Sequence, residues 1–427
     1  MGMLKTIGQA WGVPDIRKKI IFTLLMLVVF RIGSNIPVPG MDRAVLDSVF
    51  NGGAGLLALF DLFSGGSFSN FTIFALSITP YITASIILQL LTMAVPSLER
   101  LSREGTEGRK KIAQYTRYLT VVLAIIQAIG LTVGLFRRAL IQNDFFSIVV
   151  IVLTLAAGTA FLMWLGEQIN ESGIGNGISL IIFGGIISRL PSAIHTTWLK
   201  IEAGEVGIIS ILVFVLFALV VIVGIIEIQQ GQRRIPVQYA KRVVGRKVYG
   251  GQSSHIPMKV NQAGVIPVIF GLSLLQMPLT LTYFFPNTGF STWVTTWLSP
   301  YGNTAGVVIY ATLNILLIIF FTYFYTAVTF NPVDVANNMK ANGGFIPGIR
   351  PGRSTSDYLN KVMTRITFVS AIFLAIVATL PIVISQFTPF DFNFGGTSLL
   401  IVVGVALDTM RQLENQMLMR NYEGFLK

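Results

Sequence analysis

Residues 51–66 read NGGAGLLALFDLFSGG, an eight-residue apolar piece between two glycine-rich breaks. Eight residues are far fewer than the roughly 20 that a helix needs to cross a bilayer. The apolar run that follows, Phe71–Val95, is long enough, and its isoleucines at 78, 82 and 86 share one helical face. A short apolar segment on glycine hinges that leads into an isoleucine stripe predicts one of two structures. It is either a stopper beside a constriction or an interfacial loop helix before an ordinary span.

Composition places the chain in a lipid bilayer. Of its 427 residues, 53% are hydrophobic and 12% are charged, and the mean hydropathy is +0.71. Soluble proteins average about 25% charged residues, so we expect an integral membrane protein. The first 19 residues are polar and basic, without the short apolar core and cleavage site of a secretory signal peptide. The chain has no cysteine, which excludes disulfides and thiolate sites, and its two histidines argue against a histidine-rich metal site.

Ten apolar segments follow one another, and most are long enough to cross a bilayer. They are residues 20–36, 71–95, 118–136, 145–165, 174–187, 207–226, 260–285, 307–330, 366–387 and 398–419. The fifth is short and rich in glycine, and the tenth contains Asp408. Such irregular segments are tolerated at membrane depth where they pack in protein or line a cavity. The ten segments divide into two halves of five spans. Because five is odd, the second half would cross the membrane in the opposite orientation to the first, as in an inverted repeat.

Ten spans place both chain ends on one side of the membrane, and positive charge identifies that side. The N-terminal segment, the loops after the even-numbered spans and the C-terminal end hold 25 of the 31 lysines and arginines, whereas the other loops hold five. Acidic residues share this bias less strongly, so the first set carries a net charge of about +14 and the second about −2. Lysine and arginine accumulate in cytoplasmic loops. We therefore expect both termini in the cytoplasm.

Two of the expected cytoplasmic loops, residues 227–259 and 331–365, are longer than a connection requires. The first interleaves basic residues with valine and tyrosine, and its alternation around Val243–Tyr249 predicts a short β-hairpin. The second contains GIRPG at residues 348–352, whose glycines and proline predict an ordered turn. Solvated loops need no partner. Their length, aromatic content and turn chemistry favour a docking surface for a large cytosolic body that is acidic or carries RNA.

The sequence lacks the motifs of nucleotide, metal and covalent chemistry. It has no P-loop, zinc motif or nucleophile elbow, and GIGNG at residues 173–177 lacks the strand and spacing of a dinucleotide fingerprint. Asp408 is the one candidate for a buried coupling carboxylate, and it can instead cap the helix or pair with Arg411 one turn on. We therefore expect neither an enzyme nor a cofactor. The apolar interior suits a hydrophobic constriction that gates by excluding water.

Three other functions would require different residues. A secondary transporter for a small solute needs a buried polar or charged site, for which the sequence offers Asp408 alone. An intramembrane enzyme needs a Ser/His/Asp or metal constellation within the spans, and none is present. An insertase that works without a pore would lack both the stopper-like segment and the outer loop that carries it.

Motifs along nearly the whole chain resemble those of the SecY family, which forms the central subunit of the bacterial protein-translocation channel. They are TPYITASIILQLL at residues 79–91, WLGEQI at 164–169, GIGNGIS at 173–179, GQRR at 231–234, AGVIP at 263–267 and GGTSLLIVV at 395–403. The resemblance implies an all-α integral membrane protein. Its ten transmembrane helices would form two pseudo-symmetric, inverted five-helix halves around a central pore. The halves would be residues 1–200 and 201–427.

The resemblance also implies roles for individual residues. The pore ring would consist of Ile82, Ile86, Ile182, Ile186, Ile269 and Ala406. Related chains often carry a bulkier residue at the last position, so either Val405 or Leu407 replaces Ala406 in the ring or the ring is slightly wider. A plug at about residues 55–64 would seal the outer funnel through Leu56, Leu57, Leu59, Phe60, Leu62 and Phe63. The lateral gate between the second and seventh helices would use Thr83, Gln127, Ser273 and Gln276. Docking to a motor or ribosome would use Arg242, Arg246, Arg350 and Arg353.

The implied function is a protein-conducting channel. It would move unfolded secretory polypeptides across the bacterial plasma membrane and release membrane-protein helices sideways into the lipid. A signal sequence, together with the SecA motor ATPase or the ribosome, would open it, since the chain has no ATP site of its own. The expected partners are the small membrane subunits SecE and SecG, the SecA ATPase, the ribosome, signal-sequence-bearing polypeptides and membrane lipid.

Overall fold

The computed structural model describes residues 8, 10–46, 61, 64–204, 207–239, 242–244, 247–249, 253–282, 284–285, 288–300, 302–387 and 396–423. Most of these residues are helical, and ten helices match the ten predicted spans. The first five are α2 (Pro14–Gly33), α5 (Thr79–Ala94), α7 (Thr106–Ile129), α8 (Phe145–Ser172) and α9 (Gly177–Ser188). The second five are α11 (Ile208–Gln230), α12 (Ile266–Thr282), α14 (Thr304–Thr329), α16 (Arg353–Phe387) and α17 (Gly396–Glu423).

Shorter helices connect the long ones. They are α6 (Pro96–Arg103), the π-helical η1 (Gly130–Leu135), the 3-10 helix η2 (Arg137–Ala139), α10 (Leu190–Glu202), α13 (Gly289–Trp297) and α15 (Pro332–Ala341). Among the described residues, six helical stretches are long and apolar enough to cross a membrane by themselves. They contain α7, α8, α9 with α10, α11, α14 with α15, and α16. The other predicted spans correspond to α2, α5, α12 and α17, which are shorter or carry more charge.

The second span begins later than the sequence predicts. A helix over Phe71–Val95 was expected, but the residues before Thr79 form turns and Phe71 and Ser77 adopt positive φ angles of 43° and 51°. Pro80 therefore lies in the first turn of α5 and not in its interior, a position where its missing N–H costs no helical hydrogen bond. At its other end α5 meets α6 with a bend of 100°.

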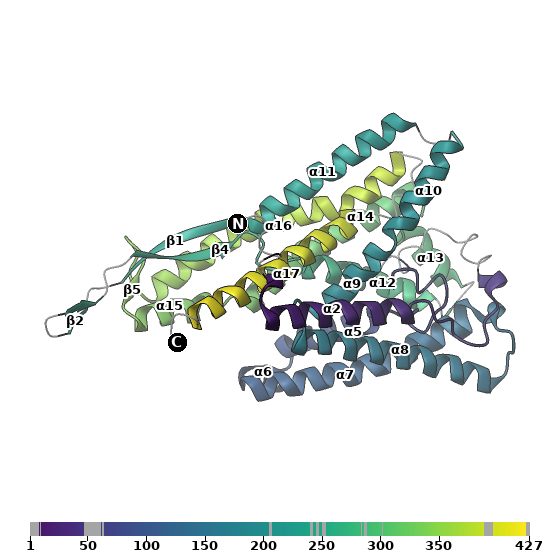
Figure 1. The fold of residues 1–427 in the computed structure, drawn as a ribbon, viewed down its shortest axis with the longest axis horizontal. Coiled ribbons are helices and arrows are strands. Elements are labelled where there is room, and N and C mark those ends of the chain that lie inside the picture. Colours follow the sequence, from purple (N-terminus) through teal and green to yellow (C-terminus); the bar gives the residue numbers. More distant parts are fainter. Residues whose placement is uncertain are drawn as a thin grey trace.

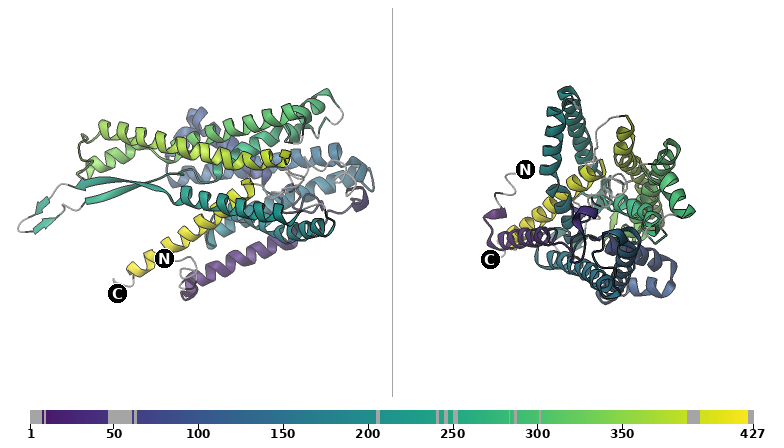
Figure 2. Two further views of the ribbon diagram at one scale, coloured as in Figure 1. Left: turned by 90° about the horizontal axis from the view of Figure 1, so that it is seen from above. Right: turned by 90° about the vertical axis from the view of Figure 1, so that its right-hand side faces the viewer.

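The long helices form two groups. In Figure 1, α2, α5, α7 and α8 lie on one side and α11, α14 and α16 on the other, with α9, α12 and α17 between them. The end-on view in Figure 2 keeps the purple-to-blue group apart from the green one. Contacts join the first five helices to the second five at α5 with α12 and at α9 with α17. The two groups therefore meet along two seams.

A small β-structure projects from one end of the molecule, which we call the sheet end (Figure 1). Strand β1 (Gln232–Tyr239) pairs antiparallel with β4 (Ser253–Lys259) on one edge and with β5 (Gly344–Phe345) on the other. Beyond them, β2 (Arg242–Val244) and β3 (Lys247–Tyr249) pair as a hairpin, which confirms the prediction for the first long loop. Because β5 comes from the second long loop, the two loops form one body.

A separate apolar core holds this body together. Ile235 and Val237 of β1 pack with Met258 of β4, Met339 of α15 and Leu359 of α16 in one buried cluster. Helix α2 begins and helix α17 ends on the side of the molecule that carries the sheet (Figure 1). The opposite end, which we call the far end, carries α10, α13 and the loop between α2 and α5 (Figures 1 and 2).

Candidate functional site

The largest apolar cluster lies where the two helix groups meet, and it contains five of the six residues predicted for the pore ring. They are Ile82 and Ile86 of α5, Ile182 and Ile186 of α9, and Ile269 of α12. All five side chains are buried. The stripe predicted on α5 therefore faces inward, together with Ile78, whereas Thr83 on another face of the helix is half-buried.

The tenth span contributes a different residue to this cluster. Val405 of α17 belongs to it, whereas Ala406 is half-buried and lies outside it. Leu407 is buried but is also outside the cluster. We call Ile82, Ile86, Ile182, Ile186, Ile269 and Val405 the apolar junction. Its members come from four helices, α5 and α9 of the first five and α12 and α17 of the second five.

Close backbone contact positions α9 within the junction. A Cβ on Gly177 would lie 1.9 Å from the carbonyl oxygen of Gly166 in α8, so a glycine is needed at this crossing. The side chain of Asn176 caps α9 by accepting a hydrogen bond from the Ser179 amide at 3.2 Å. The GIGNG sequence thus serves helix packing and capping.

The residues predicted for the lateral gate lie on or beside the seam between α5 and α12. Ser273 donates its Oγ hydrogen to the carbonyl of Ile269 at 2.8 Å, and Thr83 donates to the carbonyl of Thr79 at 3.0 Å. Both hydroxyls are therefore satisfied within their own helices. Gln276 is buried on α12, and Gln127 is half-buried on α7, which packs against α5. The described structure brings α5 and α12 into contact along this seam.

The predicted plug residues Leu56, Leu57, Leu59, Phe60, Leu62 and Phe63 lie outside the described residues. Asp61, within the same stretch, is described: its buried carboxylate forms an ion pair with Arg189, the residue that follows α9. The loop beyond it packs into a second apolar core, where the ring of Phe136 meets those of Phe68 and Phe71 edge-on. Sequence reasoning missed the Asp61–Arg189 pair. Its one signal was a single carboxylate in an otherwise apolar piece, which does not identify a partner 128 positions away.

The predicted docking arginines lie toward the sheet end. Arg350 and Arg353 are exposed on either side of Gly352, whose φ of +103° turns the chain into α16. The backbone carbonyl of Arg350 accepts a hydrogen bond from Thr355 at 2.9 Å, which fixes the turn that was predicted here. Arg242 lies on β2 in the hairpin, and Arg246 falls outside the described residues.

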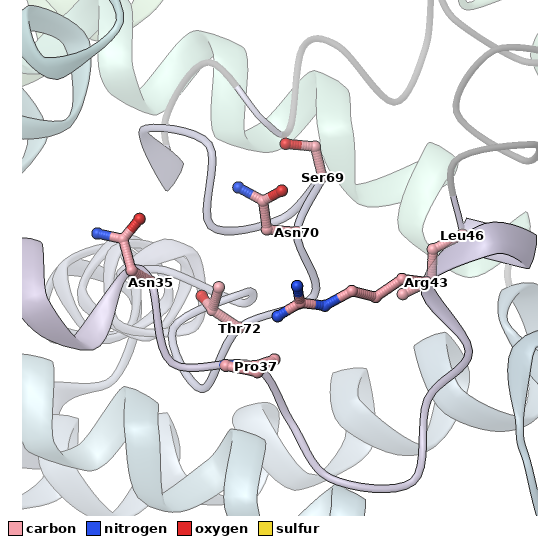
Figure 3. A pocket seen from close by; sticks show the side chains of 7 residues that line it. All are labelled: Asn35, Pro37, Arg43, Leu46, Ser69, Asn70 and Thr72. Carbon is pink, nitrogen blue, oxygen red and sulfur yellow. The ribbon is translucent and has the colours of Figure 1, made fainter.

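Two polar features lie apart from the apolar junction. Asp408 is about half exposed, and one of its carboxylate oxygens lies 3.9 Å from Arg411. Of the alternatives that the sequence left open for Asp408, the structure shows the pair with Arg411. At the far end, Asn35, Arg43, Asn70 and neighbouring residues line an open polar basin of about 320 Å³, across which the Arg43 side chain extends (Figure 3). Within the described part of the chain, no three His, Cys, Asp or Glu side chains are grouped as metal ligands would be.

Comparisons with known proteins agree with one another. The SecY family model matches residues 72–410. The chain is 51% identical to "Protein translocase subunit SecY" of Halalkalibacterium halodurans and 48% identical to the protein of the same name from Bacillus subtilis, over 100% of each chain. A solved structure described as "The structure of a protein conducting channel" is 20% identical, with a TM-score of 0.67 over 94% of this chain and 92% of the other. Sec61 in the canine ribosome-channel complex has a TM-score of 0.64 at 20% identity, over the same shares of the two chains.

Proposed function

The chain belongs to the SecY family, and from that membership we propose how its own residues seal and open a protein-conducting channel. Like its family, the protein is a channel subunit for protein translocation and not an enzyme. It is a multi-pass membrane protein with ten helices in two halves around a pore. In our proposal it carries unfolded secretory polypeptides across the bacterial plasma membrane and releases membrane-protein helices into the lipid.

The apolar junction is the proposed constriction. It draws buried aliphatic side chains from α5, α9, α12 and α17, and this is the single observation that carries the mechanism. An apolar neck cannot replace the hydration shell of an ion, so it stays dry and closed at rest. Branched aliphatic side chains can deform around any polypeptide and offer it no hydrogen bonds. We assign Val405 as the contribution of α17 in place of Ala406.

The seam between α5 and α12 is the proposed lateral gate. A signal sequence is itself an apolar helix, and it prefers contact with lipid to the aqueous funnel. It therefore favours the open arrangement and shifts a two-state equilibrium toward it. Thr83, Gln127, Ser273 and Gln276 would set the closed position of this seam. Replacing Gln127 with leucine should change how strictly signal sequences are selected, and unchanged selection would remove Gln127 from the gate.

The sheet end is the proposed docking surface, and it would face the cytoplasm together with both chain termini. Structures of relatives bound to the ribosome support a ribosome partner. We propose SecA as the second source of energy, SecE and SecG as the small membrane partners, and Arg242, Arg246, Arg350 and Arg353 as docking residues. The division at residues 200 and 201 lies in the last turn of α10, and we place the plug at about residues 55–64 of the first half.

Arg350→Glu tests the docking surface. The charge reversal should reduce transport driven by the motor about tenfold or more, because a rim charge complementary to an acidic partner becomes repulsive. Lys361→Glu, which makes the same charge reversal at an exposed position of α16 beyond this turn, is the matched control. The measurement is protease protection of a secretory precursor in vesicles that hold each purified variant. Normal transport by Arg350→Glu would contradict the assignment.

The overall proposal is tested in the same vesicles. The unaltered channel, supplied with its small membrane partners, the motor and ATP, should carry a precursor with an intact signal sequence into the lumen. It should leave the same precursor outside when the signal sequence is deleted. Equal import of both precursors would contradict a channel that a signal sequence opens. Movement of small solutes alone would contradict protein transport and favour a transporter.

A further inference from the structure

A buried ion pair fastens the loop between α2 and α5 to helix α9 at the far end. The carboxylate of Asp61 accepts a hydrogen bond from Nη2 of Arg189 through Oδ2. The Asp61 side chain is 5% exposed and that of Arg189 is 25% exposed, so water screens the pair only on the arginine side. The pair thus joins two segments that are far apart in the sequence.

The other oxygen of the Asp61 carboxylate organises the loop itself. Oδ1 accepts hydrogen bonds from Oγ of Ser64 and from the amide of Ser69, both at 3.0 Å. The same Ser64 oxygen accepts a hydrogen bond from the Phe68 amide at 3.0 Å. The carboxylate is therefore fully used in this arrangement. Hydrogen bonds from Ser64, Ser69 and Arg189 together stabilise the negative charge of this buried carboxylate.

Two more contacts hold the same loop. Nη1 of Arg31, near the end of α2, donates a hydrogen bond to the carbonyl of Gly65 at 3.1 Å. Gly65 has a φ of +65°, and a Cβ placed on it would lie 2.6 Å from the Cα of Gly185 in α9. We call Asp61, Ser64, Gly65, Ser69, Arg31 and Arg189 the loop anchor. It fixes the loop to both α2 and α9.

Helix α9 connects the loop anchor to the apolar junction. Ile182 and Ile186 of the junction lie on this helix, and Arg189 follows Ile186 by three positions, which places the two side chains on neighbouring parts of one face. Gly185, which touches the loop, is the direct neighbour of Ile186. A movement of α9 that widens the junction therefore also strains its contacts with the loop.

We infer that Asp61 and Arg189 form an electrostatic latch that sets how strong a signal sequence must be to open the channel. The inference rests on the proposed function and assigns specificity to two residues that line neither the junction nor the seam. Parting the loop from α9 would separate the Asp61 carboxylate from the Arg189 guanidinium, so the arrangement described here contains a charge-assisted hydrogen bond that a parted one lacks. The free-energy difference between these two arrangements favours the closed state. A signal sequence can shift the equilibrium only by as much as it binds the open state more tightly than the closed state. A signal sequence with a short apolar core binds the open state too weakly to offset this difference, whereas one with a full-length core offsets it.

The test compares two precursors that differ only in the apolar core of the signal sequence, one intact and one shortened. The variants are Asp61→Asn, Arg189→Gln and the double variant. The amide introduced by Asp61→Asn would keep an oxygen acceptor for Ser64 and Ser69, so the change removes chiefly the charge. Arg43→Gln makes the same Arg-to-Gln change at an exposed position of the same loop and is the matched control. The measurement is import into vesicles, expressed as the ratio of shortened to intact precursor.

Each latch variant should raise this ratio by roughly tenfold, and the double variant should raise it no further, because each single change already breaks the one pair. Arg43→Gln should leave it unchanged. An unchanged ratio in both single variants, or additive effects in the double variant, would overturn the latch. Loss of intact-precursor import in the variants would overturn it too, because the pair would then serve folding. Failure of the unaltered channel to import any precursor would instead refute the proposed function.

A second experiment tests the pair by cross-linking, which is possible because the chain has no native cysteine that would compete for the reagent. The variant Asp61→Cys/Arg189→Cys lacks the ion pair, so before treatment it should show the raised ratio. A short, cleavable bifunctional thiol reagent then replaces the ion pair with a covalent link, which should stop import of both precursors until the link is cut. Import that continues at full rate through the linked protein would show that the two segments need not part, and would overturn the inference.

Discussion

The apolar junction and the loop anchor lie at successive levels of one helix, α9, and they hold their neighbours by opposite means. The junction uses buried aliphatic side chains from four helices. The loop anchor uses an ion pair, directed hydrogen bonds and one glycine–glycine contact. Apolar contact is non-directional and depends on area, whereas hydrogen bonds and ion pairs depend on geometry and on having a partner.

This difference suits the two regions to different tasks. A constriction that must seal the empty channel and also open around any polypeptide needs contacts that tolerate changes of shape. A latch needs contacts that are either made or broken, so that the closed state is a single arrangement. The junction should therefore tolerate changes of shape and reject polarity, and the loop anchor should do the reverse.

The largest effect is expected from a polar group in the junction. Ile186→Asn would bury an amide among aliphatic side chains, at a cost of about 4 kcal/mol in the free energy of unfolding. Ile187→Asn, on the adjacent and more exposed position of α9, is the control and should cost less. Thermal unfolding of the two purified variants measures the difference. Equal destabilisation would show that the junction is no more sensitive to polarity than the outer helix surface.

A smaller effect is expected from a methyl group in the loop anchor. Gly65→Ala would force a Cβ to within 2.6 Å of the Gly185 backbone, and we expect a loss of about 3 kcal/mol. Gly66→Ala is a matched control, because Gly66 also has positive φ but a Cβ there would lie no closer than 3.7 Å to Arg189. The difference between the two variants isolates the close contact from the backbone strain. If both lose the same stability, the Gly65–Gly185 contact does not hold the loop.

The smallest effect is expected from a change of shape within the junction. Ile269→Leu keeps the volume and the apolar character of the side chain, so it should cost less than about 1.5 kcal/mol. Import of an intact precursor should stay within about twofold of the unaltered channel. A severe loss of import would mean that the junction depends on exact side-chain complementarity, and the contrast with the loop anchor would then disappear.

The sequence predicted features whose signal is local or periodic. Apolar runs predicted the ten spans, the four-residue spacing of isoleucine predicted the buried face of α5, and valine–tyrosine alternation predicted the β2–β3 hairpin. The start of α5 was predicted too early, because the residues from Phe71 to Ile78 are as apolar as a helix but pack as turns at the far end. Hydropathy cannot separate these two kinds of apolar segment.

Features that depend on contacts between distant residues were not predicted. The strand β5 joins the two long loops through pairing with β1, and its two residues carry too little pattern to be recognised. The Asp61–Arg189 pair and the presence of Val405 in the junction depend on how helices are rotated and packed. Neighbouring residues on a helix differ by about 100° in direction, so an alignment that is wrong by one position selects the wrong side chain.

The most direct test of the central claim is ion conductance through the purified channel complex in a planar bilayer. The apolar junction should keep the unaltered channel silent. Val405→Asn should make it conduct, because a polar side chain would hydrate the constriction, whereas Ala406→Asn should leave it silent. A silent Val405→Asn channel, or conduction through Ala406→Asn alone, would contradict the account.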